Sequence, residues 1–264
     1  MRRFLIAALV ILLPPVASAE TLTLYAAGSL RAALTDVVRA FEARNGGLKV
    51  EAEFAASGLL RQRIEKGDAA HVFASADVGH PQKLADAGLA RTHVGVFARN
   101  QLCALVRAGL SITSATLLYA MFDPGVRLAT STPKADPSGD YAFALFAKAE
   151  AHKSGAKAVL EAKALQLTGG PSSEKAPAGR NQYGWVMDSG QADIFLTYCT
   201  NAVLAQKEVP ALQIVQIPPE LNVGADYGMI VLKAASLSAA AGAAFIRSED
   251  GQAVLVGYGF GRGD

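Results

Sequence analysis

The sequence predicts an α/β protein whose largely parallel β-sheet is covered by helices on both faces. Three observations predict this class. From residue 21 onward, segments with a two-residue apolar period alternate with segments that repeat at helical spacing. Turns rich in glycine and serine separate these segments. The composition, 51% hydrophobic and 18% charged, supplies enough apolar material for a buried core.

The first elements follow one another in the order strand, helix, strand, helix, strand. The first helix carries Leu30, Leu34 and Phe41 on one face and stops before the turn Asn45-Gly46-Gly47. The second helix stops at Gly67. A β-α-β-α-β opening implies parallel strands. The predicted strands cover residues 21–25, 48–54 and 71–74, and the helices cover about 30–44 and 59–65.

The alternation continues to the end of the chain, where an alanine-rich helix is expected. Residues 168–180 form the longest stretch without periodicity, and a loop of this length in a compact domain is often functional. The further strands are predicted at 102–106, 126–130, 194–198, 212–217 and 227–232, with a helix at about 141–152.

The N-terminal 19 residues have the features of a secretory signal. Arg2 and Arg3 precede an apolar run over residues 4–13, and small residues follow at 16–19. The run is short for a membrane span, whereas the small residues suit a signal peptidase. We expect residues 1–19 to be a cleavable signal peptide, the alternative being a retained anchor, and the remainder to be a soluble periplasmic protein.

Charge and cysteine content limit the partners. The net charge is only +2, and no Lys/Arg cluster with interleaved aromatics is present, so nucleic acid is not an expected partner. Cys103 and Cys199 are the two cysteines. In an exported chain they can form a disulfide, but two buried thiols fit the sequence equally well.

Three strand-to-helix junctions, at residues 25–30, 54–59 and 136–141, each place a serine near a helix start: Ser29, Ser57 and Ser138. N-capping explains such a serine without any ligand. However, the carboxyl ends of strands and the helix starts line one crevice in an open α/β sheet. Unpaired amides there, together with hydroxyls, bind anions without a countercharge. The pattern therefore favours a site for a compact anion, built from neutral donors.

Signatures of enzymes and metal sites are absent from the sequence. It has no Gly-x-Ser-x-Gly elbow, and the Ser-x-x-Lys spacing of Ser172 and Lys175 falls in a loop rich in glycine and proline. The four histidines show no paired metal-ligand spacing. We expect no enzyme activity, no cofactor and no metal held directly by side chains. A secreted serine hydrolase is the least favoured alternative.

Five segments, at 25–30, 56–58, 72–77, 97–100 and 194–198, resemble in order and spacing the periplasmic molybdate-binding proteins of ABC transporters. The similarity extends to residues 251–260. It implies a type II periplasmic binding fold, with two α/β lobes joined by crossover strands and a ligand cleft between them. The implied lobes are residues 20–100 with 217–264 (lobe 1), and residues 101–216 (lobe 2).

The resemblance also implies a ligand and its contacts. A tetrahedral oxyanion, molybdate or tungstate, would be held by Ser29, Ser57, a backbone amide at Ser138 and the hydroxyl of Tyr198. Molybdenum would thus be bound as its oxyanion. The expected protein partner is the permease of an ABC transporter, and the chain itself is expected to be a monomer.

Two segments depart from the family pattern. Residues 69–71, Ala-Ala-His, replace the usual Pro-Ala-Asp. The segment that supplies the fourth family contact contains Arg180 and Asn181. An arginine facing the cleft would favour a carboxylate, so an organic acid or an anionic metal complex is the alternative ligand. The other interpretation of Arg180 is a solvated arginine in a polar loop.

Overall fold

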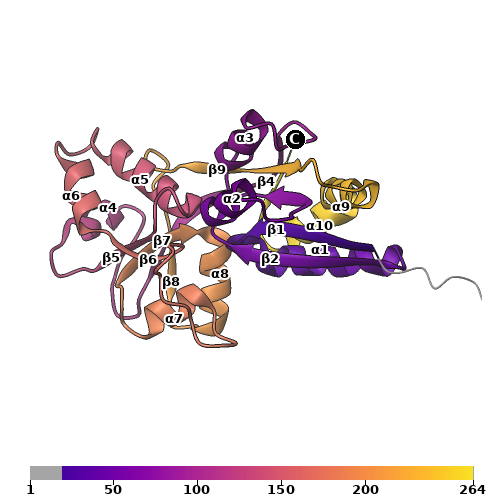
Figure 1. Cartoon of the computed structure of the whole chain (residues 1–264). Helices are drawn as coiled ribbons and strands as arrows, with labels where there is room; N and C mark the ends of the chain where they lie inside the picture. The colour runs from indigo at the N-terminus through magenta and orange to yellow at the C-terminus, as the bar shows by residue number, and fades with distance from the viewer. Residues whose placement is uncertain (1–19, 264) are drawn as a thin grey trace, which may run out of the picture.

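The structure, a computed structural model, describes residues 20–263 (Figure 1). The signal-peptide prediction for residues 1–19 lies outside the described residues. Within 20–263, no helix combines the length and apolar character needed to cross a membrane. The strands are β1 Glu20–Ala27, β2 Leu48–Ala55, β3 Val72–Ala74, β4 Gly95–Val106, β5 Leu128–Ser131, β6 Leu165–Thr168, β7 Ile194–Tyr198, β8 Gln213–Gln216, β9 Gly224–Val231 and β10 Gly261–Arg262.

Helices cover both faces of this sheet, as the alternating sequence predicts. The α-helices are α1 Arg31–Arg44, α2 Ser57–Glu65, α3 Gly79–Asp86, α4 Leu117–Phe122, α5 Pro137–Ala149, α6 Ala156–Lys163, α7 Gln182–Asp188, α8 Cys199–Glu208, α9 Leu237–Arg247 and α10 Glu249–Gly257, and a 3-10 turn, Gly28–Leu30, precedes α1.

The first lobe is built on β1, β2, β3, β9 and the first half of β4. Strands β2 and β3 pair in parallel with β1, in the predicted β-α-β-α-β order, and β9 then adds antiparallel to β3. Helices α1 and α9 pack on one face, whereas α2 and α3 pack on the other. Each face has its own apolar core, so the lobe is a three-layer sandwich.

The second lobe repeats this arrangement with β5, β6, β7, β8 and the second half of β4. Strand β5 lies between β6 and β7 and is parallel to both. Helices α5 and α6 lie against one face, and α7 with α8 close the other around a separate apolar core. Both lobes are therefore covered on both faces.

Strand β4 joins the lobes. Its residue Gln101 lies opposite Gly224 of β9, while the next residue, Leu102, lies opposite Tyr198 of β7. A single strand thus changes partner from one lobe to the other, and β9 runs beside it between the two halves of the molecule (Figure 1). The lobe boundaries near residues 100 and 217 stay a prediction.

The sheet is mixed, whereas the sequence pattern predicted a largely parallel one. Strand β4 is antiparallel to β7, β8, β9 and β10. The predicted strand 102–106 is only the second half of β4, because residues 95–101 continue it into the first lobe. The helix predicted from residue 141 starts at Pro137, since Asp136 caps its first turn.

A disulfide joins Cys103 of β4 to Cys199 at the start of α8, with Cα atoms 4.8 Å apart. The two residues come close because Cys103 pairs with Thr197 on the neighbouring strand β7. This contact decides between the disulfide and the two free thiols, which the sequence left open. The bond fixes β4 to the turn that carries Tyr198.

Candidate functional site

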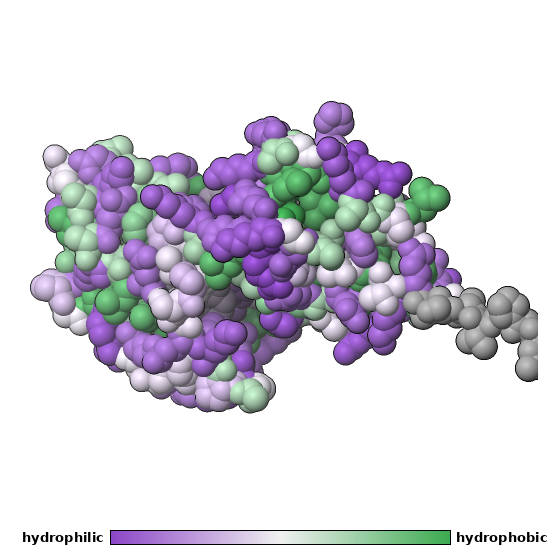
Figure 2. Space-filling model, in the orientation of Figure 1, coloured by the Kyte–Doolittle hydropathy of each residue, from purple (hydrophilic) through white to green (hydrophobic). Residues whose placement is uncertain are grey.

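A cavity of about 730 Å³ opens between the two lobes, and the surface is visibly hollowed there (Figure 2). Both lobes contribute its walls. The carboxyl ends of β1 and β2 and the following turns line one side, and the loop after β6 lines much of the other. The polar side chains in its walls include Ser29, Ser57, Asp136, Thr168, Ser173, Arg180, Asn181, Tyr198 and Asn201.

N-capping does not account for the two serines of the first lobe. The N-cap residues of α1 and α2 are Leu30 and Ala56, and neither makes a side-chain capping bond. Ser29 lies in the 3-10 turn before α1, while Ser57 is the first residue of α2. Their hydroxyls are therefore not consumed by the helix ends beside which they lie.

Ser29 and Ser57 each have one polar neighbour in the first lobe. The Ser29 hydroxyl lies 3.0 Å from the Tyr227 hydroxyl. The Tyr227 hydroxyl also accepts a hydrogen bond from the side-chain amide of Asn100 at 3.3 Å. The Ser57 Oγ accepts from the Ala76 amide at 3.1 Å. Because Ser57 accepts this bond, its own hydrogen is left to donate to another oxygen.

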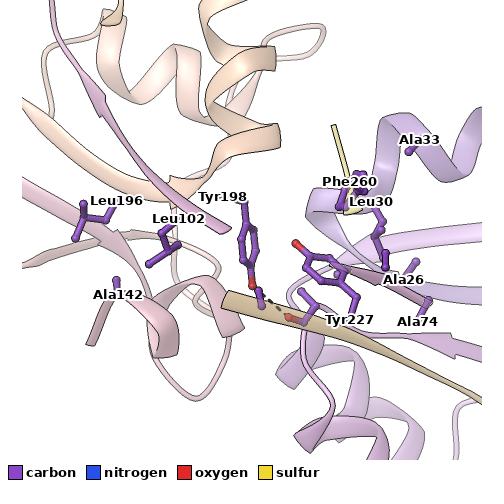
Figure 3. Packing of buried hydrophobic residues seen from close by; sticks show 14 of the residues in the cluster. Ala26, Leu30, Ala33, Ala74, Leu102, Ala142, Leu196, Tyr198, Tyr227 and Phe260 are labelled. Atoms are coloured by element: carbon purple, nitrogen blue, oxygen red, sulfur yellow. Dashed lines mark hydrogen bonds between the residues drawn. The ribbon is translucent and has the colours of Figure 1, made fainter. Parts of the chain in front are cut away.

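Tyr198 faces Tyr227 where the lobes meet, with ring centroids 5.4 Å apart (Figure 3). Its ring is almost fully buried, and its hydroxyl donates to the Ala76 carbonyl of the first lobe at 3.3 Å. Burial raises the pKa of Tyr198 well above its ordinary value, so the hydroxyl stays neutral. To donate to a ligand, it must release Ala76.

Hydrogen bonds cross between the lobes beside the cavity, among them one from the Asn100 side-chain amide to the Thr200 hydroxyl at 2.8 Å. Besides the bond from Tyr198 to Ala76, the Gly58 amide at the start of α2 donates to the Ala135 carbonyl at 2.8 Å. A Cβ on Gly58 would lie 2.5 Å from the Lys134 carbonyl oxygen. Only glycine allows this approach, so the lobes touch through backbone at one edge of the cavity.

Ser138 is fully buried and is not among the described residues that line the cavity. Its amide donates to the Asp136 carboxylate at 3.0 Å. Its hydroxyl is buried and has no hydrogen-bond partner among residues 20–263. The structure thus brings Ser29, Ser57 and Tyr198 to one cavity, while the Ser138 amide implied by the resemblance is already paired.

Asp136 is the acidic residue of this region whose role the sequence reasoning missed. It caps α5 and also lines the cavity. Burial raises the pKa of Asp136 to about 6, against a smaller opposing effect from the Ser138 amide. An aspartate that precedes a proline at a helix start predicts a helix cap. This local pattern does not indicate that the side chain also faces a cleft.

Arg180 lines the cavity but is already paired with two acids. Its Nε donates to Glu208 at 2.6 Å, and its terminal nitrogen donates to Asp188 at 2.9 Å. These bonds raise the pKa of Arg180 above its ordinary value. Asn181 also lines the cavity, but its side-chain oxygen caps α7 by accepting from two amides. Arg180 is therefore committed to two acids, whereas the cap uses only the side-chain oxygen of Asn181 and leaves its side-chain NH₂ to donate.

Tyr227 and Asn100 do not line the cavity but support Ser29 through the Tyr227 hydroxyl, and neither was predicted as a site residue from the sequence. Tyr227 lies 198 residues from Ser29 along the chain, and Asn100 lies on the crossover strand β4. Tyr227 falls in an ordinary strand pattern, and Asn100 ends the segment 97–100 of the family resemblance, which gave it no role in the site. Their role depends on the pairing of β4 with β9.

Comparison with known proteins decides the family. The family of bacterial extracellular solute-binding proteins matches residues 22–261. This chain belongs to that family. The solute-binding protein described here is 37% identical over 213 residues to an uncharacterised protein of Pasteurella multocida, covering 80% of this chain and 87% of the relative.

Two further comparisons concern molybdate-binding proteins. ModA of Mycobacterium tuberculosis is 28% identical over 250 residues, covering 94% of this solute-binding protein and 87% of ModA. The structure of the periplasmic molybdate-binding protein of Azotobacter vinelandii superposes with a TM-score of 0.71 at 19% identity, covering 90% and 98% of the two chains. The fold is the type II periplasmic binding fold, with two α/β lobes and crossover strands.

Family membership fixes the general class of function. This chain is a solute-binding protein of the ABC-transporter type, and it is not an enzyme. Proteins of this kind bind small ligands and work with transporter permeases. The choice of ligand depends on the side chains of the cavity.

Proposed function

We propose that this protein captures a tetrahedral oxyanion, molybdate or tungstate, in the periplasm and delivers it to the permease of an ABC importer. The observation that carries the proposal is the convergence of Ser29, Ser57 and Tyr198 on one cavity between the lobes. Hydroxyl donors in a partly dehydrated cleft stabilise a dianion without a full countercharge. The similarity to ModA supports the same ligand.

The serines supply the donors that such a ligand needs. Ser57 is fully buried, and its hydrogen is free because its oxygen accepts from Ala76. Ser29 shares a hydrogen bond with Tyr227, which can give its own hydrogen to Ser29 while accepting from Asn100. In that arrangement the Ser29 hydrogen also points to the ligand. Closure of the lobes would then enclose the oxyanion.

An organic acid or an anionic metal complex is the second candidate ligand, and the cavity volume favours it. About 730 Å³ is the size of a pocket for a small organic molecule, and it exceeds what one tetrahedral oxyanion needs. If Arg180 were to bind a carboxylate, it would have to give up its bond to Glu208 or Asp188. Its present pairing therefore supports the oxyanion over this alternative.

Calorimetry and thermal shift of the purified protein, freed of ligand, test the proposal. Molybdate and tungstate should raise the melting temperature, because a ligand that binds only the native state stabilises it by mass action. Sulfate has the same shape and charge but is smaller, and it should give a weaker shift. Stabilisation by organic acids alone would contradict the oxyanion and support the second candidate.

Serine variants test the assigned contacts. Ser29→Ala and Ser57→Ala each remove one hydrogen bond to a charged group, so each should weaken molybdate binding by about 10- to 100-fold. The matched control is Ser154→Ala, since Ser154 is exposed and outside the cavity. Equal affinity of the cavity variants and this control would remove the serines from the site. Arg180→Ala should leave molybdate affinity within a few-fold of the original.

A further inference from the structure

The carboxylate of Asp136 faces the ligand cavity without a cationic partner. The ion pairs formed among residues 20–263 do not include it. Its Oδ1 accepts from the Ser138 amide at 3.0 Å. Its Oδ2 lies against Gly169, where an added Cβ would come within 2.4 Å of that oxygen. Asp136 and Gly169 both line the cavity, so this edge of the carboxylate lies in the cavity wall.

The ionisable groups nearest to Asp136 do not compensate its charge. Asp140 on α5 and Asp77 after β3 are both acids, and both act to raise its pKa. Tyr183 on α7, Tyr198 on β7 and Tyr227 on β9 lie within electrostatic reach and are buried, and their own pKa values are raised. They are therefore neutral at physiological pH. The hydroxyl of Ser131, which lies 2.8 Å from that of Thr168, acts in the opposite direction and lowers the pKa of Asp136, but less than burial raises it.

The cations in the cavity wall are Arg31, Lys175 and Arg180. Arg180 is held by Glu208 and Asp188. Arg31 donates to the Phe54 carbonyl and stacks on the Phe54 ring at 4.9 Å. Lys175 is exposed, and the ion pairs formed among residues 20–263 do not include it. None of these three cations is bonded to Asp136, so an ionised Asp136 would meet a bound dianion without a cation paired to it.

We propose that Asp136 makes anion capture proton-coupled, so that the closed cleft holds a dianion together with one proton, which Asp136 donates to a ligand oxygen. The proposal rests on the proposed function, since it concerns the same cavity. The step is a proton transfer: the Asp136 carboxylate takes a proton from hydronium or a buffer acid, one O–H bond forms as the other breaks, and the resulting carboxylic acid becomes one more donor for the oxyanion. The proton replaces the missing countercharge.

The physical reason is that two like charges cannot share a poorly solvated site. A carboxylate and a dianion in contact repel, whereas a proton between them converts the contact into a short O–H···O⁻ hydrogen bond. In the free protein, burial already raises the pKa of Asp136 to about 6. A bound dianion raises that pKa further. Between the two pKa values, binding must take up one proton.

Isothermal titration calorimetry with molybdate tests this directly. At pH 7.5, titrations in two buffers with different ionisation enthalpies should report uptake of close to one proton per molybdate bound. The affinity should fall by up to tenfold for each pH unit above about 6. Binding with no proton uptake and an affinity constant between pH 6 and 8 would overturn the inference while leaving molybdate capture intact.

The variant Asp136→Asn separates proton coupling from structure. Asparagine keeps the oxygen that caps α5 and offers a permanent N–H donor to the ligand. Its molybdate affinity should be independent of pH between 6 and 8, with no proton uptake, and should exceed that of the original protein at pH 8. A pH dependence equal to that of the original protein would show that the proton binds elsewhere.

The matched control is Asp86→Asn, because Asp86 is an exposed acid on α3 that lies outside the cavity. It should keep the full proton uptake and pH dependence of the original protein. Absence of molybdate binding to every variant at every pH overturns the proposed function and, with it, the coupling. Binding that is the same for Asp136→Asn and Asp86→Asn overturns the coupling alone.

Discussion

At the scale of single residues, the site is made of buried polar groups that are electrically neutral. Ser57 and Tyr198 are at most 1% exposed, and both hold neutral hydroxyls at the edge of the cavity. Asp136 is the exception, a carboxylate forced toward its neutral form by burial. Burying an ionisable carboxylate at a helix cap lowers the stability of the folded protein, and this loss can be measured.

We predict that Asp136→Asn stabilises the ligand-free protein at neutral pH. The folded-state pKa is about 6, above the ordinary value of 3.8, so the fold disfavours the ionised form. This destabilisation is fully present above pH 6 and disappears as the pH falls through 6 toward 4. Urea unfolding at pH 7.5 should show a gain on the order of 1–2 kcal/mol. A gain that is as large at pH 4.5 would contradict the ionisation argument.

At the scale of elements, Asp193 ties three strands of the second lobe together. It is buried at the start of β7 and accepts from Arg107 after β4 at 2.5 Å. It also accepts from the backbone amide of Arg127, before β5, at 2.7 Å and from its guanidinium at 2.9 Å. These bonds, led by those from Arg127, hold the pKa of Asp193 well below its ordinary value.

We predict that Asp193→Asn lowers the free energy of unfolding by about 2 kcal/mol, because it removes a charged acceptor from two arginines. Since the pKa is lowered on folding, this contribution is present above about pH 4 and is lost as the pH falls further. Denaturation at pH 7 and pH 3 measures both effects. The variant Asp123→Asn, at an exposed turn, is the control and should change stability by less than about 0.5 kcal/mol.

The disulfide between β4 and α8 makes a second prediction at this scale. It closes a loop with a sequence separation of 96 residues. The free energy of unfolding of the double variant Cys103→Ser, Cys199→Ser should therefore be lower by about 2–5 kcal/mol. Cys199 directly follows Tyr198, so loss of the disulfide frees the segment that carries this ligand contact. The molybdate affinity of the double variant should therefore fall too. Chemical denaturation and calorimetry of the double variant measure the two effects, and an unchanged denaturation midpoint would contradict the first.

At the scale of the whole molecule, the two lobes approach each other through backbone contacts beside the ligand cavity. Gly58 of the first lobe donates to Ala135 of the second, and Tyr198 donates back to Ala76. The lobes are also linked by β4 and β9, which are extended strands that run between them (Figure 1). Such links allow the hinge motion by which binding proteins close on a ligand.

We predict that Gly58→Ala weakens molybdate binding at least tenfold, since a Cβ would lie 2.5 Å from the Lys134 carbonyl oxygen and hold the lobes apart. The ligand-free protein should remain folded, because alanine is favourable in a helix. Calorimetry and small-angle scattering measure affinity and closure. Gly46→Ala is the control, since a Cβ there meets nothing within 4 Å. Unchanged affinity in Gly58→Ala would show that this contact is not part of closure.

Much of the architecture could be predicted from the sequence, because apolar periodicity reports which face of a segment is buried. The opening strands and helices, the serines at two junctions and the tyrosine at the end of β7 were all identified in this way or through the family resemblance. The polarity of the opening strands was predictable, but the antiparallel pairing of β4 and β9 was not. Nothing local distinguishes residues 95–101 as the continuation of a strand that changes lobe and runs antiparallel to its partners.

By itself, the sequence determined the α/β class and the two serine-bearing junctions before α1 and within the start of α2, since these depend on neighbours a few positions away. The tertiary structure alone decided which side chains are already engaged. Arg180 is paired with Glu208, Cys103 is bonded to Cys199, and Tyr227 lies beside Ser29 across 198 residues of chain. Such partners are set by how distant strands pair, and a carboxylate such as Asp136 acquires its properties only from the burial that this pairing creates.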